Sequence, residues 1–426
     1  MVSTVLLVAP LLAALGHTEQ APTAKPMRLT RIEVSGGQRF SQNQVLALSG
    51  LRVGQTIHVD GLGAAANKLM SSGLFKSVSY HYRTIGVQLE ITFQIEEAEW
   101  TVPVVFDNFV WFTDEELRDA VREEVPGFDG IAPAGSGVAS AISRALQRLL
   151  DKRNIQHPVD YLPLSDEHGR NPEHVFSVKG TGLKICSVRF VGASVVPETE
   201  LLKAAQAIIS TDYSRGFVAQ FASGTLFQLY RQRGHWRAAF QRPAAKLGDD
   251  AGCSNGVAVS LSVDEGIAYL WDKAEWTGNT AMPARELDAL LAMKPGEIAN
   301  GSKVDDGVRI IRKAYLRRGY LGVRVDSEPA LDDATHRATF RVGVHEGPQF
   351  RMGTISIAGL SDATANRLKS KWVLKPGDVY DEYYSDDFLP AEVANLRRGG
   401  ATFKTVSVGR TLNTQALTVD VTITFK

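Results

Sequence analysis

A helix that stops on a glycine and turns at once into an alternating strand recurs along this chain of 426 residues. The stretch from Leu316 to Val325 reads LRRGYLGVRV, and similar junctions follow Leu69, Leu229 and Leu396. A chain that passes straight from a helix into a strand needs one residue in the left-handed conformation, which glycine adopts without steric cost. Several such junctions at regular spacing indicate a repeat architecture rather than an isolated helix end.

The residues expected in the left-handed conformation at these junctions are Gly73, Gly234, Gly319 and Gly399. The second repeat has Asn154 in the same place, and asparagine is the side chain that tolerates this conformation best after glycine. All five residues are expected to shape the chain, and none of them needs a further function.

Each junction belongs to a longer pattern in which a strand is followed by two helices and two strands. Alternating strands closed by a glycine begin at Leu29, Leu183, Tyr269 and Phe350, and a weaker copy begins at Thr101. The copies start roughly 80 residues apart, which is long enough for one small domain each. The sequence therefore predicts five units of the same kind.

The fourth unit shows the pattern most clearly. Pro283 is expected to open its first helix, and Ser302 with Asp305 has the spacing of a capping box for the second. Apolar residues at helical spacing follow, and Gly319 ends that helix before two strands. We predict an α+β protein with five tandem β-α-α-β-β domains, each a small three-stranded mixed sheet covered on one face by two helices.

The N-terminus differs from the repeats. Met1–Gly16 is almost wholly apolar, is too short to span a membrane, and ends in a small-x-small pattern before a polar stretch. We interpret it as a signal peptide; because the usual positive charges at its start are missing, the alternatives are an uncleaved anchor or a misassigned start codon.

The expected boundaries are 1–16 for the signal peptide, 17–27 for a linker, and 28–99, 100–181, 182–267, 268–347 and 348–426 for the five domains.

The chain has two cysteines, Cys186 and Cys253, and both fall in the expected third domain. An exported chain allows a disulfide between them. The distance between their Cα atoms decides whether they pair, and the sequence does not give that distance.

A β-α-α-β-β unit with a glycine–aromatic junction and an acidic strand end resembles the POTRA (polypeptide-transport-associated) domain. The best matches are VGVHEGPQFRMGTISIAGL, from Val342, and LSVDEGIAYLWDKAEWTGN, from Leu261. Five tandem copies resemble the periplasmic arm of the outer-membrane protein assembly factor family. The resemblance covers nearly everything after Met27 and is weakest in the second domain. Family members normally carry a C-terminal β-barrel, whereas LTVDVTITFK at the end of this chain reads as the last strand of the fifth domain, so a separate barrel partner is expected.

The resemblance places the strand after each glycine junction at a free sheet edge, where an extended polypeptide can add itself as another strand. It implies a protein of the periplasm, associated with the outer membrane of a diderm bacterium. The implied partners are unfolded outer-membrane polypeptides and a separate β-barrel protein or assembly lipoproteins. The alternative is an envelope scaffold that uses the same domains without client insertion. The candidate edge residues, each of which could instead only pack its own hairpin, are Val78, Tyr80, Trp236, Ala238, Val323 and Val325.

Other chemistry is weakly indicated, and we expect no enzyme, cofactor or metal. Gly61, Gly63 and Ala66 fit a dinucleotide fingerprint but lack the strand before it and the acidic residue about 20 positions later. His168 and His174 lie in a polar turn without the paired helical histidines of a zinc protease; a hidden enzyme would require a bound metal there. The net charge is zero and no basic patch stands out, which argues against nucleic acid.

Overall fold

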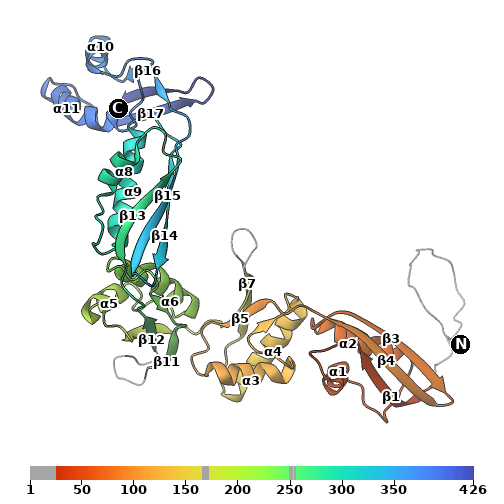
Figure 1. Ribbon diagram of the computed structural model, residues 1–426. Helices are drawn as coiled ribbons and strands as arrows, with labels where there is room; N and C mark the ends of the chain where they lie inside the picture. The colour runs from red at the N-terminus through yellow and green to blue at the C-terminus, as the bar shows by residue number, and fades with distance from the viewer. Residues whose placement is uncertain (1–24, 166–171, 249–252, 254–255) are drawn as a thin grey trace, which may run out of the picture. The chain divides into compact units, whose positions relative to one another are not determined.

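The structure is a computed structural model that describes residues 25–165, 172–248, 253 and 256–426 (Figure 1). It divides into two compact parts between Gly182 and Leu183, and each part is described by itself. The predicted signal peptide and His168 lie outside the described residues. None of the described helices combines the length and the apolar content that crossing a membrane requires.

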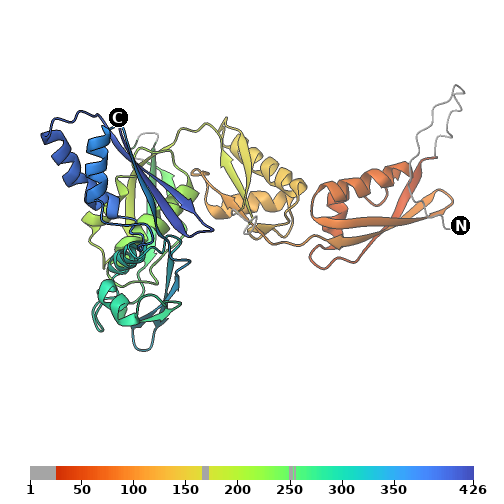
Figure 2. The ribbon, with the colours of Figure 1, turned by 90° about the horizontal axis from the view of Figure 1, so that it is seen from above.

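The N-terminal part contains two sheets, each with two helices. In the first, a helix drawn in orange-red lies over one sheet face (Figure 2). Its elements are β1 (Met27–Ser35), α1 (Gln42–Ser49), β2 (Thr56–Ile57), α2 (Asp60–Ser71), β3 (Phe75–Ile85) and β4 (Gln88–Glu97), with strand order β2-β1-β4-β3. The second has β5 (Val102–Phe106), α3 (Asp114–Glu124), β6 (Ile131–Ala132), α4 (Ser136–Lys152), β7 (Val159–Leu164) and β8 (Glu173–Val178), with order β6-β5-β8-β7.

These first two repeats share one hydrophobic core. Buried residues from Leu29 to Val178 form a continuous cluster. Phe40 of the first repeat packs against Trp100, which precedes β5, with ring centroids 6.1 Å apart. Gly73 lies so close to the start of α4 that a Cβ atom there would come within 2.7 Å of the Val138 nitrogen. The glycine therefore ends α2 and also lets the next repeat pack against it.

The C-terminal part contains three sheets. The third repeat has β9 (Lys184–Val191), α5 (Glu198–Ala205), α6 (Arg215–Phe221), the π-helical turn η1 (Ala222–Leu226), α7 (Phe227–Arg231), β10 (Ala239–Phe240), β11 (Ala244–Leu247) and β12 (Gly256–Asp264). The fourth has β13 (Leu270–Thr277), α8 (Ala284–Leu291), α9 (Gly301–Leu316), β14 (Arg324–Asp332) and β15 (Arg337–His345). The fifth has β16 (Arg351–Ala358), α10 (Asp362–Lys371), α11 (Tyr384–Arg398), β17 (Val406–Asn413) and β18 (Thr418–Phe425).

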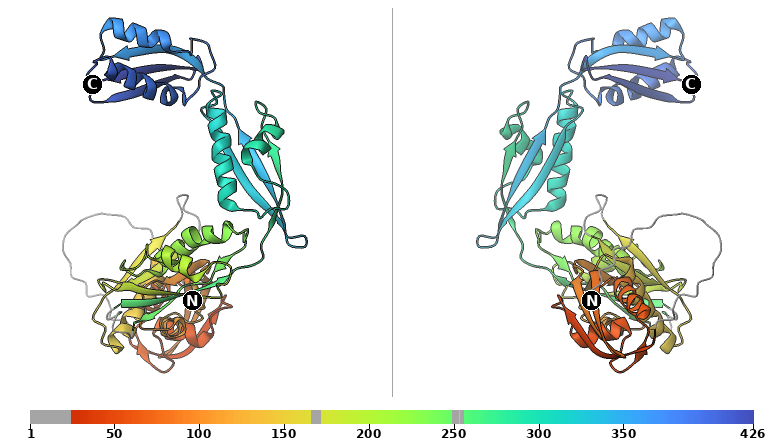
Figure 3. Two further views of the ribbon diagram at one scale, coloured as in Figure 1. Left: turned by 90° about the vertical axis from the view of Figure 1, so that its left-hand side faces the viewer. Right: turned by 90° about the vertical axis from the view of Figure 1, so that its right-hand side faces the viewer.

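The same mixed topology recurs in all three. The last strand lies in the middle, parallel to the first strand and antiparallel to the strand after the helix pair. In the fourth repeat α9 runs along its sheet in both views of Figure 3. Ile311 on α9 and Phe340 and Val342 on β15 are at most 1% exposed. The apolar side chains that recur every 3.6 residues along the helix therefore pack against those that alternate along the strand, in one core. The predicted α+β class is confirmed. The prediction of three strands in every sheet was wrong for the first three repeats. The first two sheets gain the short strands β2 and β6, and the third has four strands because β10 and β11 both pair with β12.

Two local predictions were wrong. Asn300, rather than Ser302, caps α9 by accepting a hydrogen bond from the Lys303 nitrogen at 3.0 Å. The helix starts earlier than predicted because its first residue is Gly301, which has no side chain. A Cβ atom at this position would lie 2.9 Å from the Arg231 side chain. The second correction is at the last junction, where Gly399 has φ −81° and Gly400 has φ 85°.

The last junction differs because α11 continues one residue further than predicted. The Ala401 nitrogen donates to the Leu396 oxygen, five residues back, so the left-handed position falls on Gly400. The other four junctions have their left-handed residue where it was expected, at Gly73, Asn154, Gly234 and Gly319.

Candidate functional site: free strand edges and joints between repeats

The two outer edges of each sheet are not equally exposed. The segment between the two helices pairs with the start of the first strand: β2 with β1, β6 with β5, and single bridges at Lys184–Asp212, Leu270–Ile298 and Arg351–Val379. The strand after the helix pair has no such neighbour on its outer side in sheets one, two, four and five, among the described residues. That strand is therefore the freer edge for an added chain.

The longest free edge is β3, with 11 residues and no proline. Val78 and Tyr80 lie opposite Ile95 and Phe93 of β4, are half-buried and pack on the core. Their side chains are thus occupied within the repeat, while the outer backbone groups of β3 have no partner in its sheet. This arrangement suits recognition through the main chain.

The β14 edge carries only one of its two predicted residues. Val325 lies opposite Val344 and is half-buried. Val323 precedes the strand and is 3% exposed, so it is a core residue and that prediction was wrong. The reason is a turn of chain, Leu321–Gly322, which separates the Gly319 junction from the strand.

Trp236 and Ala238 were also wrongly assigned to an edge strand. One further turn, Trp236–Arg237, follows Gly234, so pairing begins only at Ala239, and Ala238 is 8% exposed. Trp236 instead reaches the fourth repeat. Its Nε1 donates to the Ala299 oxygen at 2.7 Å, and its ring meets Phe340 edge to face at 5.1 Å. The residue is a joint residue, not an edge residue.

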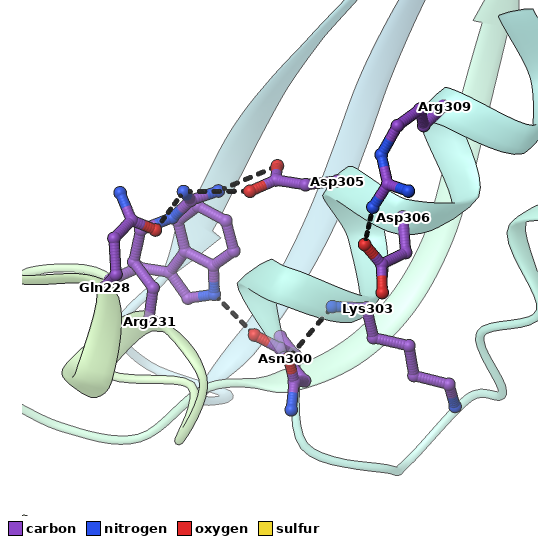
Figure 4. A network of polar contacts seen from close by, with 9 residues as sticks. Gln228, Arg231, Asn300, Lys303, Asp305, Asp306 and Arg309 are labelled. Atoms are coloured by element: carbon purple, nitrogen blue, oxygen red, sulfur yellow. Dashed lines mark hydrogen bonds and ion pairs between the residues drawn. The ribbon is translucent and has the colours of Figure 1, made fainter.

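An arginine completes the joint between repeats three and four (Figure 4). Arg231, at the end of α7, lies 4.4 Å above the Trp236 ring and makes two 3.2 Å hydrogen bonds to the Asp305 carboxylate of α9. Gln228 accepts a further bond from Arg231 at 2.7 Å. The Tyr269 nitrogen donates to the Gly234 oxygen at 2.9 Å, so the junction glycine is itself bonded to the next repeat.

The joint between repeats four and five is held by the same kinds of contact. The Phe350 nitrogen donates to the Gly319 oxygen at 2.8 Å. Arg317 pairs with Asp381 at 3.0 Å and with Asp387 at 2.8 Å. The hydrogen bond from Arg317 lowers the pKa of Asp387. Both joints therefore combine a backbone bond at the junction glycine with an arginine–aspartate pair across the repeats.

Sequence reasoning missed a second shared feature, an ion pair that lies within the third repeat and again within the fourth. The arginine before the junction glycine pairs with a glutamate of the first helix, Arg233 with Glu200 at 2.7 Å and Arg318 with Glu286 at 2.5 Å. The signal was present: the third and fourth repeats read YRQRG and YLRRG before these strands. A tyrosine four residues before the glycine and an arginine directly before it mark this pairing.

The acidic strand ends also have a structural role. In the first repeat, the Glu97 carboxylate accepts bonds from the backbone nitrogens of residues 38–40. In the third, Glu265 accepts bonds from Ser194 and Val195. In the fourth, Glu346 accepts from the Ala281 nitrogen at 2.8 Å and from the Tyr315 hydroxyl at 3.0 Å. Each carboxylate holds the loop that joins the first strand to the first helix.

Replacing Glu346 by glutamine is expected to flatten the loss of stability at acidic pH. Burial opposes ionisation of Glu346, but bonds from Thr280, Ala281 and Tyr315 outweigh it and hold its pKa below 4.5. A lowered native pKa gives stability that is complete above the unfolded-state pKa and is lost as the pH falls through the native one. Urea unfolding at pH 7 and pH 3.5 should show a smaller difference for E346Q than for the wild type. Equal differences would show that Glu346 does not contribute.

The remaining predicted residues have structural partners. Cys186 on β9 and Cys253, shortly before β12, form a disulfide with Cα atoms 5.4 Å apart. His174 is 3% exposed, with its Nε2 2.8 Å from the Pro133 oxygen and its Nδ1 2.9 Å from the Tyr161 hydroxyl. Both ring nitrogens are thus engaged. Across the described residues, no group of three or more metal-ligating side chains is assembled.

Comparison with known proteins places this architecture among relatives. Residues 269–347 match the POTRA family model, described as a surface antigen variable number repeat. The chain is 24% identical to a putative outer membrane protein assembly factor of Treponema pallidum over 228 residues, which cover 51% of this chain and 27% of that protein. It is 24% identical to the outer membrane protein assembly factor BamA of Neisseria meningitidis over 177 residues, covering 39% and 22%. The matches thus span about a quarter of the length of these relatives.

Among solved structures, the crystal structure of POTRA domains 3–5 of BamA from Haemophilus influenzae is similar at 22% identity and a TM-score of 0.40, covering 57% of this chain and 96% of that one. The family match falls on the fourth repeat, β13 to β15, where the β-α-α-β-β order is most regular. The fourth repeat is therefore a POTRA domain, and the chain is similar to outer-membrane protein assembly factors.

Proposed function

We propose that this protein is a periplasmic scaffold, without enzymatic activity, that binds unfolded outer-membrane polypeptides along its free strand edges during β-barrel assembly or secretion. It would work beside other outer-membrane assembly components, such as a barrel protein or lipoproteins. The relationship to assembly factors supports the process, and the free edges support the binding mode.

The observation that carries the proposal is the asymmetry of the sheets. The first strand is covered at its start by the segment between the helices, whereas β3 and β14 are unpaired on their outer sides within their sheets. An unpaired edge offers backbone donors and acceptors with little sequence preference. Clients of an assembly scaffold differ in sequence but share the alternation of barrel strands, which such an edge can read.

Pro329 shows which backbone groups of β14 face outward. Pro329 lies opposite Phe340, and the pairing of β14 with β15 continues unbroken through it. Because proline has no N–H to donate, it fits in a paired strand only where that position faces away from the partner strand. The backbone nitrogen of Pro329 therefore faces the free edge. Backbone groups of alternate residues point to the same side, so Val325, four residues earlier, also directs its N–H to the free edge.

Replacing Val325 by proline is expected to weaken client binding at least about fivefold, because one outward donor of the added ladder is lost. Binding is measured by fluorescence anisotropy with a ten-residue peptide of alternating apolar and polar residues. Val325→Thr keeps the N–H and serves as the matched control. Circular dichroism checks that β14 stays paired with β15.

Unchanged binding of a folded V325P protein would exclude the β14 edge. The same peptide with methyl groups on alternate backbone nitrogens tests the binding mode without altering the protein, since it cannot form the ladder on one side. Full binding of that peptide would contradict strand addition at any edge. In cells, crosslinking that recovers division or inner-membrane proteins and no outer-membrane precursors would favour an envelope scaffold instead.

A further inference from the structure

One end of the first repeat combines exposed apolar side chains with unpaired positive charge. Two turns form this end, the turn Arg52–Gln55 before β2 and the hairpin turn Gly86–Val87 between β3 and β4. Val53 is 60% exposed, Val87 is 73% exposed, and Ile85 beside it is 44% exposed. We call this surface the β1 end.

Hydrogen bonds place the two turns on either side of the start of β1. The Arg28 nitrogen donates to the Val87 oxygen at 2.8 Å. The Leu29 nitrogen donates to the Gln55 oxygen at 2.9 Å, and the Leu29 oxygen accepts from Gly54 at 2.7 Å. Val53 and Val87 are therefore held at the same end of the sheet by backbone bonds, not by a loose loop.

The charge at the β1 end has one sign. The three segments that build it, residues 25–30, 50–58 and 84–89, contain Lys25, Arg28, Arg52 and His58 but no aspartate or glutamate. The lysine and both arginines are exposed, and none of the three forms an ion pair with any described residue. The first acidic residues beyond these segments are Glu19, Glu33, Asp60 and Glu90; Glu33 pairs with Arg31 at 2.6 Å.

We propose that the β1 end is a docking surface for an anionic phospholipid bilayer. Apolar loop tips and cations on the same segments match the two layers of a membrane surface. The apolar side chains can enter the boundary of the acyl chains while the cations contact the lipid headgroups. The whole chain has zero net charge, so its composition predicts no attraction to an anionic surface. The β1 end, with three cations and no acidic residue in its segments, is positively charged and would attract such a surface locally.

The chain that precedes the described residues joins the first repeat at Lys25, at the same end of the sheet. A protein partner would be served by a contiguous groove, whereas the tips here stand on two separate turns with charge between them.

Vesicle cosedimentation of the chain from His17 to Lys426 tests the proposal. This form lacks the predicted signal peptide and keeps every described residue. The vesicles contain phosphatidylethanolamine with about a third phosphatidylglycerol, and phosphatidylcholine vesicles supply the uncharged comparison. We expect binding to the anionic vesicles that weakens at high salt and is at least about tenfold weaker on phosphatidylcholine.

The double variant V53S/V87S should bind the anionic vesicles about tenfold more weakly, since two apolar tips are removed. R28Q/R52Q should lose about as much, and its remaining binding should respond less to salt. V373S/L412S removes side chains that are 67% and 48% exposed in the C-terminal part, and should bind like the wild type. No binding by the wild type, equal binding to both vesicle types, or full binding by V53S/V87S would each overturn the proposal.

Discussion

Replacing Cys253 by serine is expected to lower the free energy of unfolding of the third repeat by about 4 kcal/mol. The disulfide joins β9 to the start of β12, two neighbouring parallel strands, and its cysteines are 67 residues apart in the sequence. The closed loop contains the helices α5 to α7 and the strands β10 and β11. Closing so long a loop removes much of the conformational entropy of the unfolded chain.

The effect is measured by urea unfolding monitored through hydrogen exchange of the backbone amides of β9 and β12. The exchange rates of these amides give the stability of the third repeat separately from that of the other repeats. Wild-type protein treated with a reducing agent should match C253S, and Cys186→Ser should match both. Adding reductant to C253S should change nothing further. Equal stability of the wild type and C253S would show that the crosslink does not constrain the unfolded chain.

Replacing Gly319 by valine is expected to destabilise the joint between repeats four and five by about 3 kcal/mol. Gly319 has φ 80°, a conformation that a β-branched residue adopts only with strain. A Cβ atom there would also lie 2.4 Å from the Phe350 oxygen. The Phe350 nitrogen donates to the Gly319 oxygen, so the clash falls on the residue whose backbone bond links the two repeats.

Gly322→Val is the matched control for this prediction. Gly322 lies three residues later, and a Cβ atom built on it meets no atom within 4 Å. The control should stay within about 0.5 kcal/mol of the wild type, as surface substitutions usually do. The measurement is urea unfolding together with exchange of the Phe350 amide, which should speed up in G319V alone. Equal stabilities of the two variants would contradict a role for Gly319 in the joint.

The sequence predicted the order of elements because local rules determine them. The left-handed residue that separates helix from strand is dictated by backbone sterics, and four of its five predicted positions were correct. The fifth prediction was wrong because two glycines, Gly399 and Gly400, stand side by side at that junction. Either could adopt the left-handed conformation, and only the last hydrogen bonds of α11 decide that Gly400 does. Alternation in β15 likewise indicated which side chains are buried.

The candidate site was harder to predict, because an edge is a property of strand order and not of one strand. Trp236 and Val323 follow their glycines in sequence as an edge residue would, yet each is placed by packing elsewhere. The arginine–aspartate pairs at the joints, such as Arg231 with Asp305, join residues that are 64 to 74 positions apart, and no local pattern indicates such contacts.

The sequence by itself determined the repeat, its β-α-α-β-β order and the need for a left-handed residue at each junction, since these follow from steric and hydrophobic patterns within a few turns of chain. Only the tertiary structure decided which edge stays open, which aromatic residue joins two repeats, and that Val53 and Val87 lie at the same end of a sheet. These features depend on contacts between distant segments, whose free energies come from packing and charge that the order of residues along the chain does not specify.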